Sequence, residues 1–401
     1  MWWVGALAGV ALMSWLGLKG FAWSDYDTEA SGAYRTLSSG DVGGFLTQVP
    51  AYGGSLVLRA PFAAVAALLG GGELAVYRAV SIPCLLAVAL LGLVLTRRMG
   101  DRGHSTGARA IVLGLCVVNP VTLRALEYGH PEELLAAALC VGALLAAIDR
   151  RTILAAVLLG LAIATKSWAV LAIGPVLVAL PARRLLALTI AGGVTLTVLA
   201  PILLSGSHMT NTLVTGATTT GQIFHPWHIF WFLGDPAATQ IGPAGVPRGP
   251  GYRAPPEWLT PLTHPLIVAL VVPLTLAWAW VHRTVPRLGG EQVLLLLALL
   301  LLLRCMLDPW NAVYYALPCL LALLAWEALC CSERPPVLAL AASGLVWVTF
   351  EIAPDMLAPD GQCLVFLAWS LPLAAWLARE SLAPARRVAP RPTRPVRLQR
   401  V

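Results

Sequence analysis

Three acidic residues in the stretch FAWSDYDTEASGAY (residues 21–34) are the first candidates for chemistry. Asp25, Asp27 and Glu29 directly follow the first apolar segment, in a chain of 401 residues of which only 12% are charged. A carboxylate placed there can act as a general base toward a hydroxyl group or as a metal ligand. The alternative is a hydrated loop whose Ser-Asp start caps a helix. The spacing of the acids alone leaves both interpretations open.

Cations and histidines supply a second group of candidates. Lys166, in GLAIATKSWAV, is one of two lysines and lies between two apolar segments, and Arg304 lies in an apolar run with Asp308 four residues on. Such charges are costly in a membrane, so they either bind an anion such as a lipid phosphate or reach the interface. For Arg304, a pair with Asp308 within one helix is the alternative. His225 and His228, three residues apart, could contact the same phosphate.

The motif EYGHPEE and several aromatic residues are candidates for binding the rest of a substrate. The motif lies at the end of an apolar segment, where a polar turn between two helices is the alternative. The aromatic stretch FHPWHIFWFL suits a helix lying at the membrane interface. No Cys/His spacing typical of a zinc site occurs, and we expect no metal ligands. The candidate substrate-binding residues are Glu127, His130, Glu132, Asp308, Trp227 and Tyr315.

The elements that position these residues must be membrane helices. The chain is 58% hydrophobic, and apolar runs long enough to cross a bilayer recur along it. We predict an all-α polytopic membrane protein of about twelve spans, with short interfacial helices in its outer loops. The predicted spans lie near residues 1–23, 74–96, 108–126, 133–148, 152–165, 168–181, 185–204, 264–282, 292–307, 311–329, 336–353 and 362–378.

The distribution of arginine predicts the topology. Eighteen of the 27 basic residues fall in alternate loops and in the C-terminal tail, which the positive-inside rule places in the cytoplasm together with both termini. The long loops 24–72 and 205–263 are then extracytoplasmic, as is the active site. We expect one transmembrane unit over 1–381 and a disordered basic tail over 382–401 that contacts membrane lipids. This topology accounts for the basic residues, so no nucleic-acid partner is expected.

Three stretches carry a resemblance to a known family. They are SDYDTEASGAYRTLSSG with VPAYGGSLVLRAPF after the first span, YGHPEELLAAAL, and RRTILAAVLLGLAIATKSWAVLAIGPVLVAL. In this order the chain resembles the GT-C superfamily of membrane glycosyltransferases, in particular the bacterial family-87 enzymes that use polyprenol-phosphate-mannose. It departs from the family's usual pattern at His130, where Gln is more common, and at AYGG, where Tyr-Pro-Pro is common.

The resemblance implies a GT-C-like fold and an inverting transfer. A sugar, mannose in the family, moves from a polyprenyl-phosphate donor to a hydroxyl of a glycolipid or cell-envelope glycan, in the bacterial plasma membrane. Asp25, or else Asp27, is the base, and Lys166, aided by Arg304 or a histidine, holds the donor phosphate. No cofactor is obligatory, and a divalent cation could bind but is not required. The competing hypotheses are a transporter or flippase of a lipid-linked or anionic substrate and a non-catalytic partner in envelope assembly.

Overall fold

The computed structural model describes residues 2–17, 24–50, 52–206, 224–241, 247–283, 291–330 and 334–383, and the regular elements in these ranges are helices. Within them, seven helical segments are long and apolar enough to cross a membrane, and five shorter apolar helices accompany them. The predicted all-α polytopic membrane protein is confirmed, whereas the count of twelve spans stays a prediction. The predicted tail lies almost wholly outside the described residues.

The first half of the chain supplies most of the elements that surround the site. The π-helical turn η1 and the helices α2 to α4 occupy the predicted first outer loop, so this loop is largely helical. One of these helices, α4, is apolar and was not predicted from the sequence. The elements are α1 (Trp2–Leu16), η1 (Tyr26–Ala30), α2 (Ser31–Ser38), α3 (Val42–Gln48), α4 (Gly53–Leu68), α5 (Glu73–Asp101), α6 (Thr106–Val117), α7 (Pro120–Glu127), α8 (Glu132–Ile148), α9 (Thr152–Thr165), η2 (Ser167–Ala172), α10 (Ile173–Ala179) and α11 (Arg184–Leu204).

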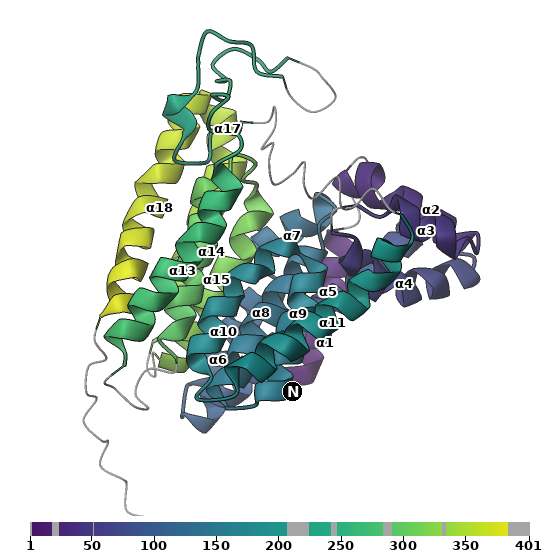
Figure 1. Cartoon of the computed structure of the whole chain (residues 1–401), viewed down its shortest axis with the longest axis horizontal. Helices are drawn as coiled ribbons and strands as arrows, with labels where there is room; N and C mark the ends of the chain where they lie inside the picture. Colours follow the sequence, from purple (N-terminus) through teal and green to yellow (C-terminus); the bar gives the residue numbers. More distant parts are fainter. Residues whose placement is uncertain are drawn as a thin grey trace, which may run out of the picture.

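The second half adds a layer of helices on one flank, where α13, α14, α15 and α18 run beside one another (Figure 1). Its α14 is buried along its whole length except at Leu303, because the helix is apolar all round and α13, α15 and α18 pack about it. The elements are η3 (Trp231–Leu233), α13 (Thr263–Val281), α14 (Val293–Leu307), η5 (Val313–Ala316), α15 (Leu317–Cys330), α16 (Val337–Trp347), η6 (Val348–Ile352), α17 (Ala353–Met356) and α18 (Pro359–Leu382).

Three arginine-rich loop regions and the EYGHPEE motif lie at opposite ends of the helix bundle. At one end, Arg98 pairs with Asp149 at 2.6 Å and Arg102 with Glu291 at 2.7 Å, so three of the arginine-rich loop regions meet there. The opposite end of α8 carries EYGHPEE. These three regions are therefore separated from EYGHPEE by the length of α8, and the side of the membrane that each end faces stays a prediction.

The predicted interfacial helix over FHPWHIFWFL is wrong. The segment forms turns and then the single short 3₁₀ turn η3. Its backbone N–H groups at His225 and Ile229 donate to the carbonyls of Pro309 and Met306, at 2.9 Å each. Because these donors are used at the end of α14, and Pro226 has none, the segment is an irregular strap over that helix end.

Candidate active site

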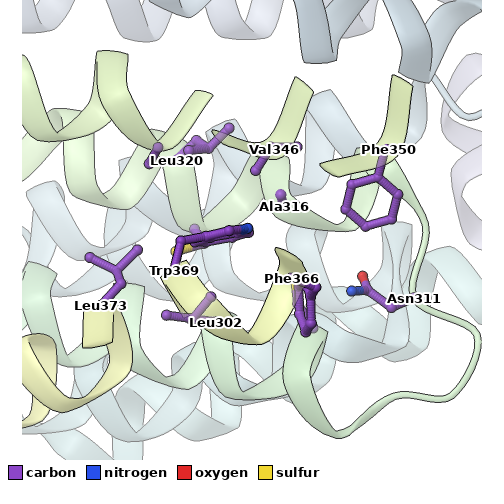
Figure 2. Close-up of a pocket in the computed structure, with 12 residues that line it drawn as sticks. Leu302, Asn311, Ala316, Leu320, Val346, Phe350, Phe366, Trp369 and Leu373 are labelled. Atoms are coloured by element: carbon purple, nitrogen blue, oxygen red, sulfur yellow. The ribbon is translucent and has the colours of Figure 1, made fainter. Parts of the chain in front are cut away.

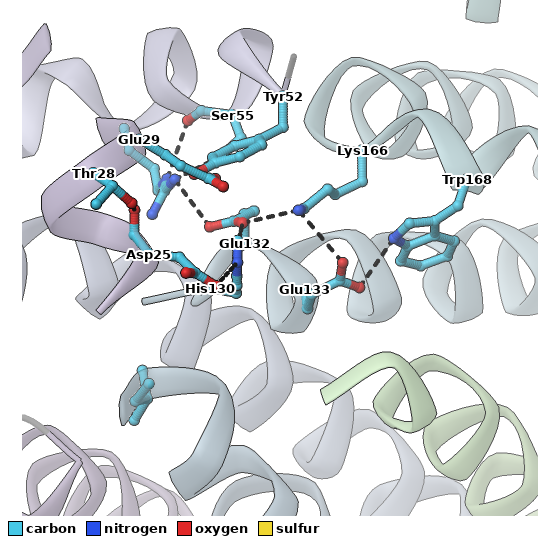
Figure 3. Close-up of polar contacts among 12 residues, drawn as sticks. Asp25, Thr28, Glu29, Tyr52, Ser55, His130, Glu132, Glu133, Lys166 and Trp168 are labelled. Carbon is cyan, nitrogen blue, oxygen red and sulfur yellow. Dashed lines mark hydrogen bonds and ion pairs between the residues drawn. The ribbon is translucent and has the colours of Figure 1, made fainter. Parts of the chain in front are cut away.

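A buried carboxylate, Glu132, lies at the centre of the site. It opens α8, its side chain is fully buried, and three cationic groups surround it (Figure 3). His130 donates from Nδ1 to Glu132 Oε1 at 2.7 Å, Lys166 Nζ lies 3.0 Å from the same oxygen, and Arg59 Nη2 lies 3.3 Å from Oε2. A carboxylate this deep is stable only when paired in this way. EYGHPEE is therefore a polar turn between helices and also the core of a charged cluster.

The neighbouring Glu133 continues the cluster toward α14. It accepts a hydrogen bond from Trp168 Nε1 at 2.9 Å and lies 3.5 Å from Lys166 and 3.6 Å from Arg304. Lys166, between α9 and η2, is thus shared by two carboxylates and is mostly buried. Lys166 therefore lies at the predicted break between two helices, and its functional role stays a prediction.

Asp25 is where the cluster reaches the surface. Its Oδ2 lies 3.1 Å from His130 Nε2, while 42% of its side chain stays exposed. Asp27 has a different position, since its Oδ2 accepts from Ser24 N at 2.8 Å and closes the start of η1. Of the two candidate bases, Asp25 is therefore the one that joins His130 and Glu132.

Protonation of His130 adds a fourth cation to the cluster. Burial and the Lys166 ammonium lower the pKa of His130, but the Glu132 and Asp25 carboxylates outweigh them and raise it to about 9. At neutral pH the imidazolium and the three cations Arg59, Lys166 and Arg304 face the carboxylates of Asp25, Glu132 and Glu133. A fourth carboxylate, Glu29, accepts a hydrogen bond at 2.7 Å from the hydroxyl of Tyr52, whose ring Lys166 contacts. Four cations are therefore balanced by four carboxylates.

Aromatic rings wall the cluster. The Lys166 ammonium lies 4.2 Å from the centre of the Tyr52 ring, and Arg304 lies 4.1 Å from that of Tyr315. The His130 ring packs against Tyr314, with centroids 4.6 Å apart. These contacts fix the cations in place and exclude water from one side of them.

Arg304 and Asp308 do not form the alternative pair within one helix. Arg304 turns to Glu133, whereas the Asp308 carboxylate lies 3.4 Å from His264 Nε2 on α13 and accepts from Trp310 N at 2.9 Å. Because Asp308 follows the last residue of α14, its extended backbone points its side chain away from that of Arg304. The roles of these two residues toward a substrate stay predictions.

Within the described part of the chain, neither histidine of the strap pairs with Glu132. His228 is fully buried against Phe224 and Trp231, and its Nδ1 accepts from Phe230 N at 3.1 Å. Burial lowers the pKa of His225 and of His228 to about 3, so both rings are neutral at pH 7 and attract a phosphate only weakly.

The remaining substrate candidates, Trp227 and Glu127, pair with residues outside the cluster around Glu132. Trp227 packs on Phe350 at 4.6 Å, and Glu127 pairs with Arg124 at 2.5 Å instead of joining Glu132. Their contacts with substrate are untested predictions.

A narrow apolar pocket lies between α14, α15, α16 and α18 (Figure 2). Asn311 and Phe350 lie at one end of it and Leu373 at the other. Its volume of about 10 Å³ is that of roughly one water-sized sphere, so in this conformation it holds neither a sugar ring nor a lipid chain.

Arg59, Glu133 and Trp168 belong to the cluster but were not among the predicted site residues. Arg59 and Glu133 carry the signal that identified Lys166, a charge within or beside an apolar helix. Arg59 was not predicted because it lies on α4, which falls within the predicted outer loop 24–72. Trp168 has no comparable signal, because a tryptophan near a helix end is common at membrane interfaces.

A comparison with known families matches the part of the chain that contains most of the cluster. Residues 47–183 match the family model described as alpha-(1->6)-mannopyranosyltransferase, N-terminal domain. The resemblance to membrane mannosyltransferases is confirmed. The matched segment contains Arg59, His130, Glu132 and Lys166, and it supports a glycosyltransferase that acts with mannose. No curated protein gives a significant match to the chain.

Proposed function

We propose that the chain is an inverting glycosyltransferase that moves mannose from a polyprenyl-phosphate donor to a hydroxyl of a glycolipid or cell-envelope glycan at the extracytoplasmic face. One observation carries the proposal. The half-exposed Asp25 carboxylate is held by His130, whose other ring nitrogen pairs with Glu132, and His130, Glu132 and Lys166 lie in the segment matched by a mannosyltransferase model.

In the proposed reaction, Asp25 takes the proton of the acceptor hydroxyl while the acceptor oxygen attacks the anomeric carbon of the donor. The bond from that carbon to the phosphate oxygen breaks, and polyprenyl phosphate leaves with the bonding electrons. A single displacement inverts the configuration at the anomeric carbon.

Lys166 and Arg304 stabilise the charge that develops on the leaving phosphate. Both already pair with carboxylates, but Arg304 Nη1 is buried without a hydrogen-bond partner and is available as a donor. A monophosphate leaving group therefore requires no divalent cation in this scheme.

The test is mannose transfer from labelled polyprenol-phosphate-mannose to a membrane lipid extract by the purified chain. Asp25→Asn removes the base but keeps an oxygen that can accept from His130, so we expect turnover to fall on the order of 10²–10⁴-fold while the fold persists. Asp27→Asn is the matched control, because its amide oxygen can still accept from Ser24 N. Undiminished transfer by Asp25→Asn, or an equal loss in Asp27→Asn, contradicts the assignment.

A further inference from the structure

An exposed tyrosine lies directly beside the proposed base. Tyr128 follows α7 with 44% of its surface exposed, and its backbone carbonyl accepts from Asp25 N at 3.1 Å. Its ring packs against Tyr314, which in turn packs against His130, with centroids 6.1 Å and 4.6 Å apart. The ring is therefore fixed relative to Asp25 and leaves much of its surface uncovered.

One helical turn before Tyr128, Arg124 is clamped between two carboxylates. Its Nη1 lies 2.5 Å from Glu127, its Nη2 donates to Glu351, and its guanidinium stacks over Trp347 at 5.5 Å. Glu351 comes from the second half of the chain, from the π-helical turn η6 between α16 and α17. Such turns are often found at functional sites, since the extra residue redirects side chains.

The clamped arginine and Glu351 each keep a polar atom without a partner. Arg124 Nε and Glu351 Oε1 are both buried and make no hydrogen bond. The Glu351 side chain as a whole is nine-tenths buried. An unsatisfied donor and an unsatisfied acceptor in one ion pair are costly unless a ligand completes them.

We propose that Tyr128, Arg124 and Glu351 form the acceptor subsite, which binds an uncharged sugar ring and presents its hydroxyl to Asp25. The inference rests on the proposed function and specifies its acceptor. A sugar hydroxyl both donates and accepts, so one hydroxyl can satisfy Glu351 Oε1 and another Arg124 Nε. The exposed Tyr128 ring offers the flat apolar surface on which the C–H face of a pyranose packs.

The charge of the subsite selects against anionic acceptors. One arginine faces the two carboxylates of Glu127 and Glu351, and the Asp25 carboxylate lies next to Tyr128. A phosphorylated or uronic-acid ring would place its charge against this excess of carboxylates. The subsite therefore suits a neutral saccharide, while the anionic donor phosphate is directed to the cations Lys166 and Arg304.

The test combines binding and turnover with methyl α-1,6-mannobioside as the acceptor probe. Saturation-transfer NMR on the purified full chain in micelles reports contact with the sugar, and initial rates report its KM. We expect Tyr128→Ala to weaken binding on the order of tenfold and Tyr128→Phe to retain it, because only the ring is needed. Glu351→Gln is expected to raise the KM for the sugar on the order of tenfold, with the donor KM unchanged.

Asp360→Asn is the matched control for Glu351→Gln. Asp360 also pairs with an arginine, Arg253 at 2.9 Å, but both its oxygens are satisfied. The KM of the Asp360→Asn variant for the sugar should equal that of the unaltered chain. Thermal unfolding monitored by circular dichroism verifies that each variant is folded.

The outcomes separate the subsite from the transferase activity. Binding that is lost in Tyr128→Ala, in a chain that transfers no mannose, supports the saccharide site and overturns the proposed function. Transfer with an unchanged sugar KM in folded Tyr128→Ala and Glu351→Gln supports the function and overturns the subsite. The absence of saturation transfer from the unaltered chain to the sugar, at about 10 mM sugar, also overturns the subsite.

Discussion

Replacing Glu132 with glutamine tests whether this carboxylate holds the site together. The substitution keeps the side chain's size but removes the negative charge that faces Arg59, Lys166 and protonated His130. His130 retains Asp25, and Lys166 retains Glu133. Arg59, whose side chain is 3% exposed, loses the carboxylate with which it pairs and keeps uncharged partners such as the hydroxyl and carbonyl of Ser55.

The expected loss of stability is therefore that of one broken buried ion pair and not of three. Removing one partner of such a pair costs about 3–5 kcal/mol, because the other charge stays buried without compensation. The matched control is Asp149→Asn, which breaks the exposed pair with Arg98 at the opposite end and should cost about 1 kcal/mol or less.

Equilibrium unfolding in mixed micelles, followed by tryptophan fluorescence, measures both variants. Adding Arg59→Met to Glu132→Gln removes the uncompensated cation, so the double variant should be more stable than Glu132→Gln alone. The reasoning is refuted if Glu132→Gln loses no more stability than Asp149→Asn, or if Arg59→Met destabilises it further.

Two further predictions concern the geometry and protonation of the site. Gly129 has φ +89°, and a Cβ there would lie 2.4 Å from Tyr26 N, so Gly129→Ala should displace the segment that carries Asp25 and lower activity at least tenfold. Gly40→Ala, at φ +88° in open space, shares the backbone strain without the clash and should stay active; equal losses would exclude the clash as the cause. His130 has a pKa raised above its ordinary value of 6.5 to about 9, so its stabilising contribution is complete below 6.5 and is lost as the pH rises through about 9. Melting temperatures from pH 6 to 10 should therefore fall more steeply for the unaltered chain than for His130→Gln, and parallel curves would contradict the raised pKa of His130.

The sequence alone determined the membrane fold and its helices, because span length and hydropathy are local properties of the chain. A helical segment lies at each predicted span, although one span is divided into two helices, α6 and α7, the second of which begins at Pro120. The acids after the first span, the EYGHPEE turn and Lys166 were likewise visible, since a charge beside an apolar run is conspicuous. The first outer loop was less predictable, because α4 has the composition of a short span next to polar residues.

Only the tertiary structure decided which charges meet. Asp25 and His130 are separated by more than a hundred residues, yet their side chains touch, whereas Arg304 and Asp308 are four residues apart and pair with different helices. Glu351 reaches Arg124 from the other half of the chain for the same reason. A buried charge must find its partner among the groups that packing brings near, and that choice depends on helix contacts that no local pattern encodes.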